Sequence, residues 1–326
     1  MSRRATSSCG KGIPGLQAVE GGRGRARGRS NSRTKTHASV SSSSRSAPPG
    51  ARGPHPSRRG NPMTQAASSQ PSVDELREKV ALACQILAQH GLVKGSTGHV
   101  STREPGTDNI LVRGRPQSDR GLRFAEPTSI MRVDLEGQPV GDNGGVNRVS
   151  EIYLHTDLYK YRPDVNAVIH AHPPGVLLCT MNRVELRPIF SGYEPGAMRI
   201  ALNNEAPVYD RSITLHTPEE TAPFLDLMAH HNMVMMRGHG IVVAGRTVEQ
   251  AVSRALALEN LARINWLAHL GGGAPDISDE DKAEWRRRSR NPSRADREGG
   301  GWTGLVAILE HGALRADSIS LGANFG

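Results

Sequence analysis

Apolar residues from residue 72 onward recur with two different periods, which predict helices and strands. Directly after Ser72 the spacing is three to four residues, as on one face of a helix. The positions of this stripe are Leu76, Val80, Ala83, Cys84 and Leu87. Ser72 and Glu75 stand at the spacing of a capping box, and Gly91 follows the stripe as a stop signal. We therefore predict a helix here and interpret Cys84 as a core residue.

Three more helices are predicted further along the chain. One covers about residues 150–161, and a long one covers about residues 248–269, where a run of three glycines ends it. The segment from Thr217 to Glu220 predicts the start of the third, with Thr217 as N-cap, Pro218 at the first position and acids in the first turn.

Short apolar runs between these helices predict strands. They cover residues 110–112, 130–135, 165–170, 233–236 and 241–244. Strands that alternate with helices over about 210 residues indicate a single α/β domain. From Asp276 the chain is charged and predicted to be loop-like, with a short apolar patch at 305–309 that can dock on the domain.

The charge of the chain is divided unevenly. The whole sequence of 326 residues carries a formal net charge of +9. Residues 1–62 hold 13 of the 41 basic residues and a single acid, Glu20, so the remainder has 28 basic and 31 acidic residues and a net charge of −3. This division argues against a basic, nucleic-acid-binding globule.

Residues 1–62 are rich in Arg, Ser, Gly and Pro and nearly lack large apolar side chains, so we predict a disordered tail. Its composition also resembles a transit peptide or a nucleic-acid-binding arm. Because Met63 opens the region predicted to fold, the tail can also come from an upstream start codon that is rarely or never used. The predicted organisation is a tail at 1–62, a catalytic domain at 63–275 and a charged extension at 276–326.

Three kinds of protein do not fit this sequence. It has no run of 18 apolar residues, which argues against a transmembrane span. Its three cysteines lie far apart and form neither a disulfide framework nor a zinc knuckle. We therefore expect a cytoplasmic protein that binds neither membranes nor nucleic acid.

Histidines at the end of a predicted strand carry the clearest chemical signal. His170 and His172 are two positions apart, so an extended strand projects both imidazoles to the same side. Pro173 and Pro174 end the strand directly after them. Such a pair is a suitable start for a metal site, although a lone His-x-His is often only a solvated strand edge.

Two further residues favour the metal site. His239 lies between Gly238 and Gly240, where the backbone can turn tightly and approach a ligand closely. It can be the third imidazole. Glu151, at the start of a predicted helix, can act as a proton shuttle or a further ligand. Three histidines and a water are the arrangement of a catalytic zinc with an open position.

The combined motifs resemble the class II aldolase/adducin family over roughly residues 73–270. The matching segments are Gly98-His99-Val100-Ser101, Ser150-Glu151-x-x-x-His155, His170-Ala171-His172-Pro173 and Gly238-His239-Gly240. The resemblance implies a three-layer α/β/α fold around a central mixed or antiparallel sheet. It also implies a divalent metal, most often zinc, and a homotetramer with sites at subunit interfaces. By this resemblance His170, His172 and His239 are metal ligands and Glu151 is the catalytic carboxylate.

Several positions depart from the sugar-phosphate aldolases of this family. Those enzymes have Asn where this chain has His99, and a Ser pair where it has Val149 and Ser150. Their phosphate-binding loop is replaced by residues 113–124, which contain four arginines. Guanidinium groups bind planar carboxylates well, but arginine runs are also common on solvated surfaces.

Together, the Gly-His-Val-Ser segment and this arginine loop resemble the branch that handles aromatic acids, which decarboxylates 3,4-dihydroxyphthalate and similar hydroxylated benzoates. The resemblance implies that Glu151 moves the proton while His99, Ser101 and Ser150 contact substrate. In the same reading, Arg115 or Arg120 anchors a second carboxylate. Tyr193 lies near the place of a tyrosine that acts across the subunit interface. His155 shares the helix face of Glu151, so it can hydrogen-bond a ligand or that carboxylate.

Other functions remain open on the sequence alone. A sugar-phosphate aldolase or epimerase is the first alternative, although the usual phosphate loop is absent. An iron-dependent oxygenase is another, because three histidines also bind Fe(II), and manganese is a further possible metal. A non-enzymatic binding module, as in adducins, is disfavoured because the three metal histidines are present. The favoured prediction is a lyase that decarboxylates a small hydroxylated aromatic acid.

Overall fold

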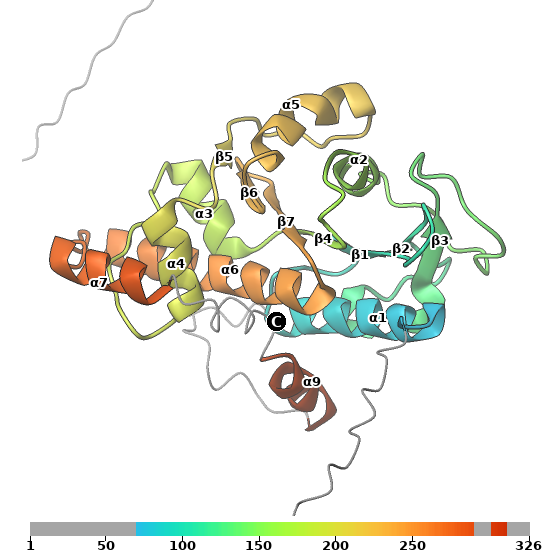
Figure 1. Ribbon diagram of the computed structural model, residues 1–326, viewed down its shortest axis with the longest axis horizontal. Coiled ribbons are helices and arrows are strands. Elements are labelled where there is room, and N and C mark those ends of the chain that lie inside the picture. Colours follow the sequence, from blue (N-terminus) through green and yellow to red (C-terminus); the bar gives the residue numbers. More distant parts are fainter. Residues whose placement is uncertain (1–69, 290–300, 312–326) are drawn as a thin grey trace, which may run out of the picture. The chain divides into compact units, whose positions relative to one another are not determined.

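A seven-stranded sheet forms the centre of the computed structural model, which describes residues 70–289 and 301–311 (Figure 1). The strands are β1 (His99–Arg103), β2 (Ile110–Arg113), β3 (Ile130–Val133), β4 (Ala167–Ala171), β5 (Val208–Tyr209), β6 (Met233–Met236) and β7 (Gly240–Gly245). Their order is β3-β2-β1-β4-β7-β6-β5, and all neighbours are antiparallel except the parallel pair β5 and β6. The predicted central mixed sheet is confirmed.

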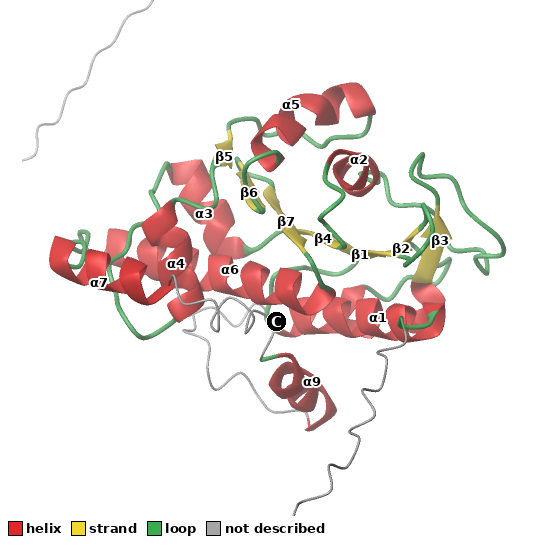
Figure 2. Ribbon diagram, in the orientation of Figure 1, coloured by secondary structure: helices red, strands yellow, loops and turns green. Residues whose placement is uncertain are grey.

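Helices cover both faces of this sheet (Figure 2). On one face lie α1 (Val73–Gln89), α3 (Pro174–Asn182), α4 (Pro195–Asn203) and α6 (Val248–Leu270), and on the other lie α2 (Tyr153–Tyr161) and α5 (Pro218–Met228). Successive strand residues explain the two layers, because Ile169 packs among the first helices and Val168 among the second. This is the predicted three-layer α/β/α architecture.

Three of the predicted helix starts agree with the structure. The Ser72 hydroxyl accepts from the backbone N–H of Glu75, and the Glu75 carboxylate accepts from the N–H of Ser72. Thr217 caps α5 by accepting from the N–H of Glu220, and Thr247 caps α6 in the same way. These side chains satisfy backbone donors that have no partner inside the helix.

Other elements differ from the prediction. Strands β1 and β5 and helices α3 and α4 were not expected, and α2 begins at Tyr153, so Glu151 precedes the helix. The region predicted to be loop-like from Asp276 forms α7 (Asp279–Ser289). Its acids lie in the first turn and its arginines in the last, so the charges complement the helix dipole.

The predicted docking of the C-terminal apolar patch is confirmed. Helix α9 (Trp302–His311) lies beside α1 and packs Trp302, Leu305, Val306 and Leu309 against the core. Two short 3-10 helices, at Leu122–Phe124 and Pro127–Ser129, connect β2 to β3. Among the described residues, no helix combines the length and apolar character that crossing a bilayer requires. The predicted tail at 1–62 lies outside the described residues.

Candidate metal centre

Three strands bring the predicted metal ligands to the same edge of the sheet. His170 is in β4, opposite His99 of β1, and His172 follows directly after β4. His239 lies in the tight turn between β6 and β7. A Cβ atom on Gly240 would lie 2.2 Å from the carbonyl oxygen of Ala171, so only glycine allows this close approach.

The four side chains form one compact cluster. One donor atom from each of Glu151, His170, His172 and His239 can be chosen so that all lie within 4.8 Å of one another. The Nε2 atoms of His170 and His172 are 2.9 Å apart. Oε2 of Glu151 lies 3.4 Å from Nε2 of His170 and 3.7 Å from Nε2 of His239. The structure thus brings together the four residues on which the metal prediction depends.

Backbone carbonyl groups orient two of the imidazoles. Nδ1 of His170 lies 3.0 Å from the carbonyl oxygen of Ile241, and Nδ1 of His239 lies 2.9 Å from that of Ile213. A carbonyl oxygen only accepts, so each Nδ1 carries the proton. The lone pair of each Nε2 therefore faces the cluster, as in histidines that bind metals.

A loop that the sequence analysis did not single out holds the cluster from the other side. Residues 211–216 follow β5, and the backbone N–H of Leu215 donates to Oε1 of Glu151 at 3.1 Å. The Ile213 carbonyl in the same loop positions His239. Both contacts come from the main chain and join residues more than 20 positions apart, so no local pattern signals them.

Ionisation of the cluster follows from burial and neighbouring charges. Burial alone would raise the pKa of Glu151, but the adjacent His170 and His239 hold it well below its ordinary value. Burial and the adjacent His170 and His239 lower the pKa of His172 to about 3. For His239, burial disfavours protonation, yet the adjacent carboxylate of Glu151 raises its pKa. The cluster therefore combines an ionised carboxylate with an imidazole, His172, that stays neutral.

This donor set fits a divalent metal. Three imidazoles and a carboxylate are typical zinc ligands, and the same set also binds iron and manganese. Without a cation, the lone pairs of His170 and Glu151 would face each other in a buried place. The residues present are therefore suited to the group that the sequence predicts.

A pocket of about 630 Å³ opens beside His239. Its walls are formed by Arg211, Ser212, Ile213, Thr214, His216, Glu220 and Gly238, together with His239 itself. Neither Arg211 nor His216 was among the residues predicted to bind substrate or metal. The pocket shows that the loop 211–216 borders the space next to the metal cluster.

The arginine loop lies at the same edge of the sheet, because Ser101 of β1 pairs with Val112 directly before it. Its arginines have different environments. Arg113 is buried and forms an ion pair with Asp119, while the exposed Arg120 stacks on Phe124 with its guanidinium carbon 4.6 Å from the ring centre. Arg115 is exposed, and its backbone forms a bridge to Asn147. Arg113 therefore stabilises the loop.

His99 is connected to a buried polar chain behind the cluster. Its Nδ1 lies 2.6 Å from Nε2 of His155, whose Nδ1 lies 2.6 Å from Oγ of Ser101. That hydroxyl lies 2.9 Å from the phenolic oxygen of Tyr159. His155 contacts His99 and Ser101, and Ser101 is fully buried with only protein partners. Ser101 is thus shielded from the pocket.

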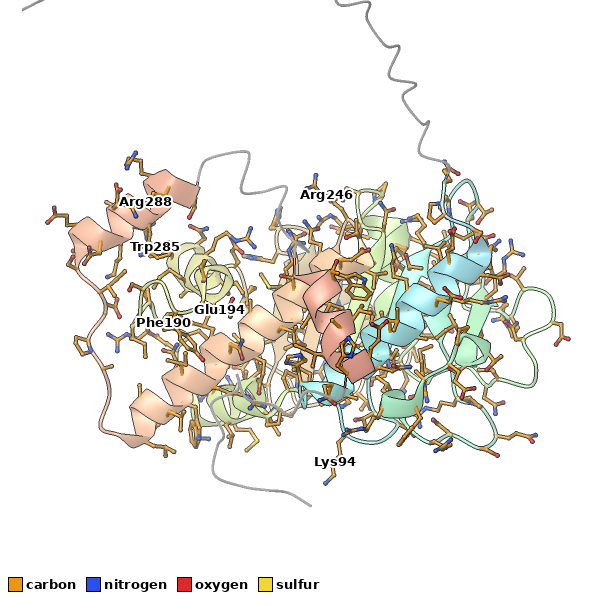
Figure 3. The ribbon with its side chains drawn as sticks, turned by 90° about the horizontal axis from the view of Figure 1, so that it is seen from below. Lys94, Phe190, Glu194, Arg246, Trp285 and Arg288 are labelled. Atoms are coloured by element: carbon orange, nitrogen blue, oxygen red, sulfur yellow. The ribbon has the colours of Figure 1, made fainter. Side chains whose placement is uncertain are left out.

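Two other predicted residues lie on the surface. Ser150 is exposed directly before Glu151. Tyr193, 57% exposed, packs edge-on against Phe190 with the ring centres 6.1 Å apart. Figure 3 shows Phe190 and Glu194 in the same region as Trp285 of α7. The single chain therefore does not bring Tyr193 into the histidine cluster.

Comparisons with known proteins agree with this geometry. Residues 78–266 match the Class II Aldolase and Adducin N-terminal domain. The chain is 38% identical over 228 residues to a protein of Arthrobacter keyseri named 3,4-dihydroxyphthalate decarboxylase, covering 69% of this chain and 88% of that protein. It is 32% identical over 217 residues to a protein of the same name from Rhodococcus jostii strain RHA1, covering 65% and 87%.

A solved structure of similar fold is the aldolase II superfamily protein from Pseudomonas syringae. It superimposes with a TM-score of 0.64 at 21% identity and covers 76% of this chain and 96% of that protein. The sequence match extends over more than half of the chain, and the solved structure has the same fold. The chain belongs to the class II aldolase and adducin family.

Proposed function

We propose that the protein is a metal-dependent lyase that decarboxylates a hydroxylated aromatic carboxylate resembling 3,4-dihydroxyphthalate. Two similar proteins are named for that activity. The observation that carries the proposal is the cluster of Glu151, His170, His172 and His239 beside an open pocket. A lone carboxylate next to three imidazoles provides both a metal site and a group that can move a proton.

The metal in this proposal is a divalent cation, most simply zinc, held by His170, His172 and His239. When bound, it acts as a Lewis acid that stabilises negative charge on the phenolic oxygens of the substrate. The Nδ1 contacts to carbonyl groups fix His170 and His239 for this role.

Glu151 is the proposed proton carrier. The carboxylate is ionised, and a phenolic hydroxyl made more acidic by the Lewis acid would give its proton to Oε2 as substrate binds. The same oxygen then returns the proton to the ring carbon from which CO₂ departs. The bond between the ring and the carboxyl carbon breaks, and its electron pair forms the new C–H bond. The Leu215 N–H on Oε1 keeps Oε2 directed toward the cluster.

Binding of the substrate carboxylates is assigned to cationic side chains at this edge of the sheet. Arg115 and Arg120 remain the proposed anchors of a second carboxylate, with His99 next to the carboxylate that leaves. The pocket adds Arg211 as a further cation for this purpose, and Ser150 lies exposed beside Glu151. Guanidinium groups suit this task because they bind a carboxylate through two parallel hydrogen bonds.

The proposed assembly is a homotetramer with sites between subunits. Tyr193 is more than half exposed in the single chain and would then contact substrate in a neighbouring subunit. Measuring the mass of the native assembly in solution tests this, and a monomer at catalytic concentration would contradict it.

A substrate panel tests the function. Protein loaded with zinc or manganese is offered 3,4-dihydroxyphthalate, dihydroxybenzoates and ketose phosphates, first without oxygen and then in air. Release of CO₂ from an aromatic acid under anaerobic conditions is expected. Formation of an aldehyde from a ketose phosphate would instead identify an aldolase, and turnover that needs O₂ would identify an oxygenase.

A further inference from the structure

The four residues His99, His155, Ser101 and Tyr159 form a continuous hydrogen-bonded chain, which we name the buried relay. It runs from the metal edge of the sheet to the layer between the sheet and α2, with successive distances of 2.6, 2.6 and 2.9 Å. His155 and Ser101 have no exposed surface, and Tyr159 is 1% exposed. Each bond in such a chain needs one donor and one acceptor, so the whole relay has a direction.

The buried end determines this direction. The Tyr159 hydroxyl proton needs an acceptor, and the hydrogen bonds of the described residues offer it Ser101 Oγ. If Ser101 donated to Tyr159 instead, the phenolic proton would be buried without an acceptor, which is costly. Tyr159 therefore donates to Ser101, and Ser101 donates its own proton to Nδ1 of His155.

The direction then continues to the metal edge. His155 accepts at Nδ1, so its ring proton is on Nε2 and points to Nδ1 of His99. His99 accepts at Nδ1 and carries its own proton on Nε2. Within the described part of the chain, no hydrogen bond takes up Nε2 of His99. That N–H is thus available to a ligand, and the ring lies next to His170 with their centres 5.0 Å apart.

We propose that Tyr159, Ser101 and His155 are positioning residues that fix His99 as the tautomer with its proton on Nε2. In this form His99 offers a hydrogen-bond donor to a carboxylate oxygen of the substrate and presents no lone pair to the metal. The substrate assignment rests on the proposed function, whereas the tautomer assignment rests on the relay alone. Ser101 consequently acts through His155 and does not touch substrate.

The tautomer can be observed directly in zinc-loaded protein without substrate. Nitrogen NMR of protein labelled with ¹⁵N-histidine distinguishes protonated from bare ring nitrogens, and the His99→Asn variant identifies the His99 signals. We expect a protonated Nε2 and a bare Nδ1 for His99. A protonated Nδ1 would overturn the proposal, whatever the enzyme acts on. Correct tautomer signals with no decarboxylation would contradict the proposed function alone.

A matched pair of variants tests the direction of the relay. In His155→Gln, the amide can accept from Ser101 and donate to His99, so the His99 tautomer is kept. In His155→Glu, the carboxylate accepts from both neighbours and forces the His99 proton onto Nδ1. We expect kcat to fall at least about 10-fold further in the Glu variant, with zinc content unchanged in both. Equal kcat and equal His99 spectra in the two variants would overturn the proposal.

Tyr159→Phe is the mildest test, because it removes only the hydroxyl at the far end of the relay. Ser101 is then bonded only to Nδ1 of His155 and can either donate to it or accept from it, so we expect two sets of His99 signals and a kcat lowered about 10-fold at unchanged KM. This variant also covers the case in which the Glu variant does not fold. A single, unchanged His99 signal set in Tyr159→Phe would show that the tautomer is fixed by something else.

Discussion

The two ends of strands β4 and β7 carry different basic side chains, histidines at one end and arginines at the other. One end presents the histidines, and the other opens into a pocket of about 290 Å³. The lining of that pocket includes Arg162, Arg199, Arg246 and Arg254. Figure 3 shows Lys94 and Arg246 on opposite sides of the molecule; Leu92, close to Lys94 in the chain, accepts from the His172 N–H, and Arg246 lines the pocket at the other end. Both ends combine a cavity with a cluster of titratable or charged groups.

The difference lies in where the polar atoms point. Arg162 donates to both carboxylate oxygens of Asp164 at 2.7 Å and to the carbonyl of Met228 at 2.8 Å. Arg254 donates to the carbonyl of Ala244. At the histidine end the backbone instead takes up Nδ1 and leaves Nε2 for a ligand. A cavity with charged walls becomes a site when its donor atoms remain directed into it.

The largest expected effect comes from breaking the histidine end. His170→Ala removes a central donor of the cluster and should abolish zinc binding together with activity, by at least about 10⁴-fold. Metal analysis after gel filtration and the CO₂ assay measure the two effects. His216→Ala, which changes the pocket wall and leaves the cluster intact, is the control for zinc content. Full zinc stoichiometry in His170→Ala would refute the ligand assignment.

Changing the carboxylate separates metal binding from proton transfer. Glu151→Gln keeps the size and can still accept from the Leu215 N–H, but it cannot carry the proton. We expect zinc to be retained and kcat to fall about 10²–10⁴-fold, the usual range for general acid–base catalysis. A variant that keeps its kcat would show that another group moves the proton.

Acid should destabilise the metal-free protein through the histidine end. Burial lowers the pKa of His155 to about 3, whereas an unfolded histidine titrates near 6.5. Between these two pH values the unfolded state binds more protons than the folded state. Each pH unit of acidification therefore lowers the free energy of unfolding by about 1 kcal/mol through this residue. His172 acts in the same direction, and His239, whose pKa is raised, acts in the opposite one.

The measurement is chemical denaturation of the metal-free protein at several pH values from 7 down to 4. The His155→Gln variant should lose part of this pH dependence, because its amide does not titrate. An identical slope in the variant and the parent would contradict the assignment. The arginine end should contribute only near pH 4, where the unfolded state begins to protonate Asp164, whose pKa the hydrogen bonds from Arg162 lower; the guanidinium groups remain protonated throughout.

The smallest effect is expected at the arginine end. Arg162→Met leaves the Met228 carbonyl and the Asn232 side chain without this donor, which should lower the free energy of unfolding by about 1–3 kcal/mol. The kcat and zinc content should remain those of the parent, because the change lies at the far end of the strands. A large loss of kcat in a stably folded variant would mean that the two ends are coupled.

Local signals in the sequence were sufficient for much of the fold. Caps at Ser72 and Thr217 mark helix starts because their side chains bond to nearby backbone. The alternation of His170 and His172 signals the metal edge because strand geometry is regular. Strand β1 was missed because it is short and mostly polar, and its burial depends on pairing with distant strands.

Parts of the candidate site could not be read from local pattern. The Ile213 carbonyl contacts His239, and the Leu215 N–H donates to Glu151. Both groups belong to the main chain, so the residue types of the sequence give no sign of these contacts. His155 was expected beside Glu151 because both were assigned to one helix. The helix begins only at Tyr153, so that spacing rule does not apply to Glu151. Helix α7, in contrast, could have been predicted from its acids-first, arginines-last order.

The main-chain character of the loop 211–216 has a consequence for how such enzymes diversify. Ile213 and Leu215 hold the reactive groups through a carbonyl and an N–H, so these contacts place no demand on the identity of the neighbouring side chains. Arg211, Ser212, Thr214 and His216 line the pocket from the same loop. In the proposed enzyme, mutations at Arg211, Thr214 and His216 can therefore change the pocket while His239 and Glu151 stay in place; Ser212, whose hydroxyl donates to the Arg237 carbonyl, is the exception.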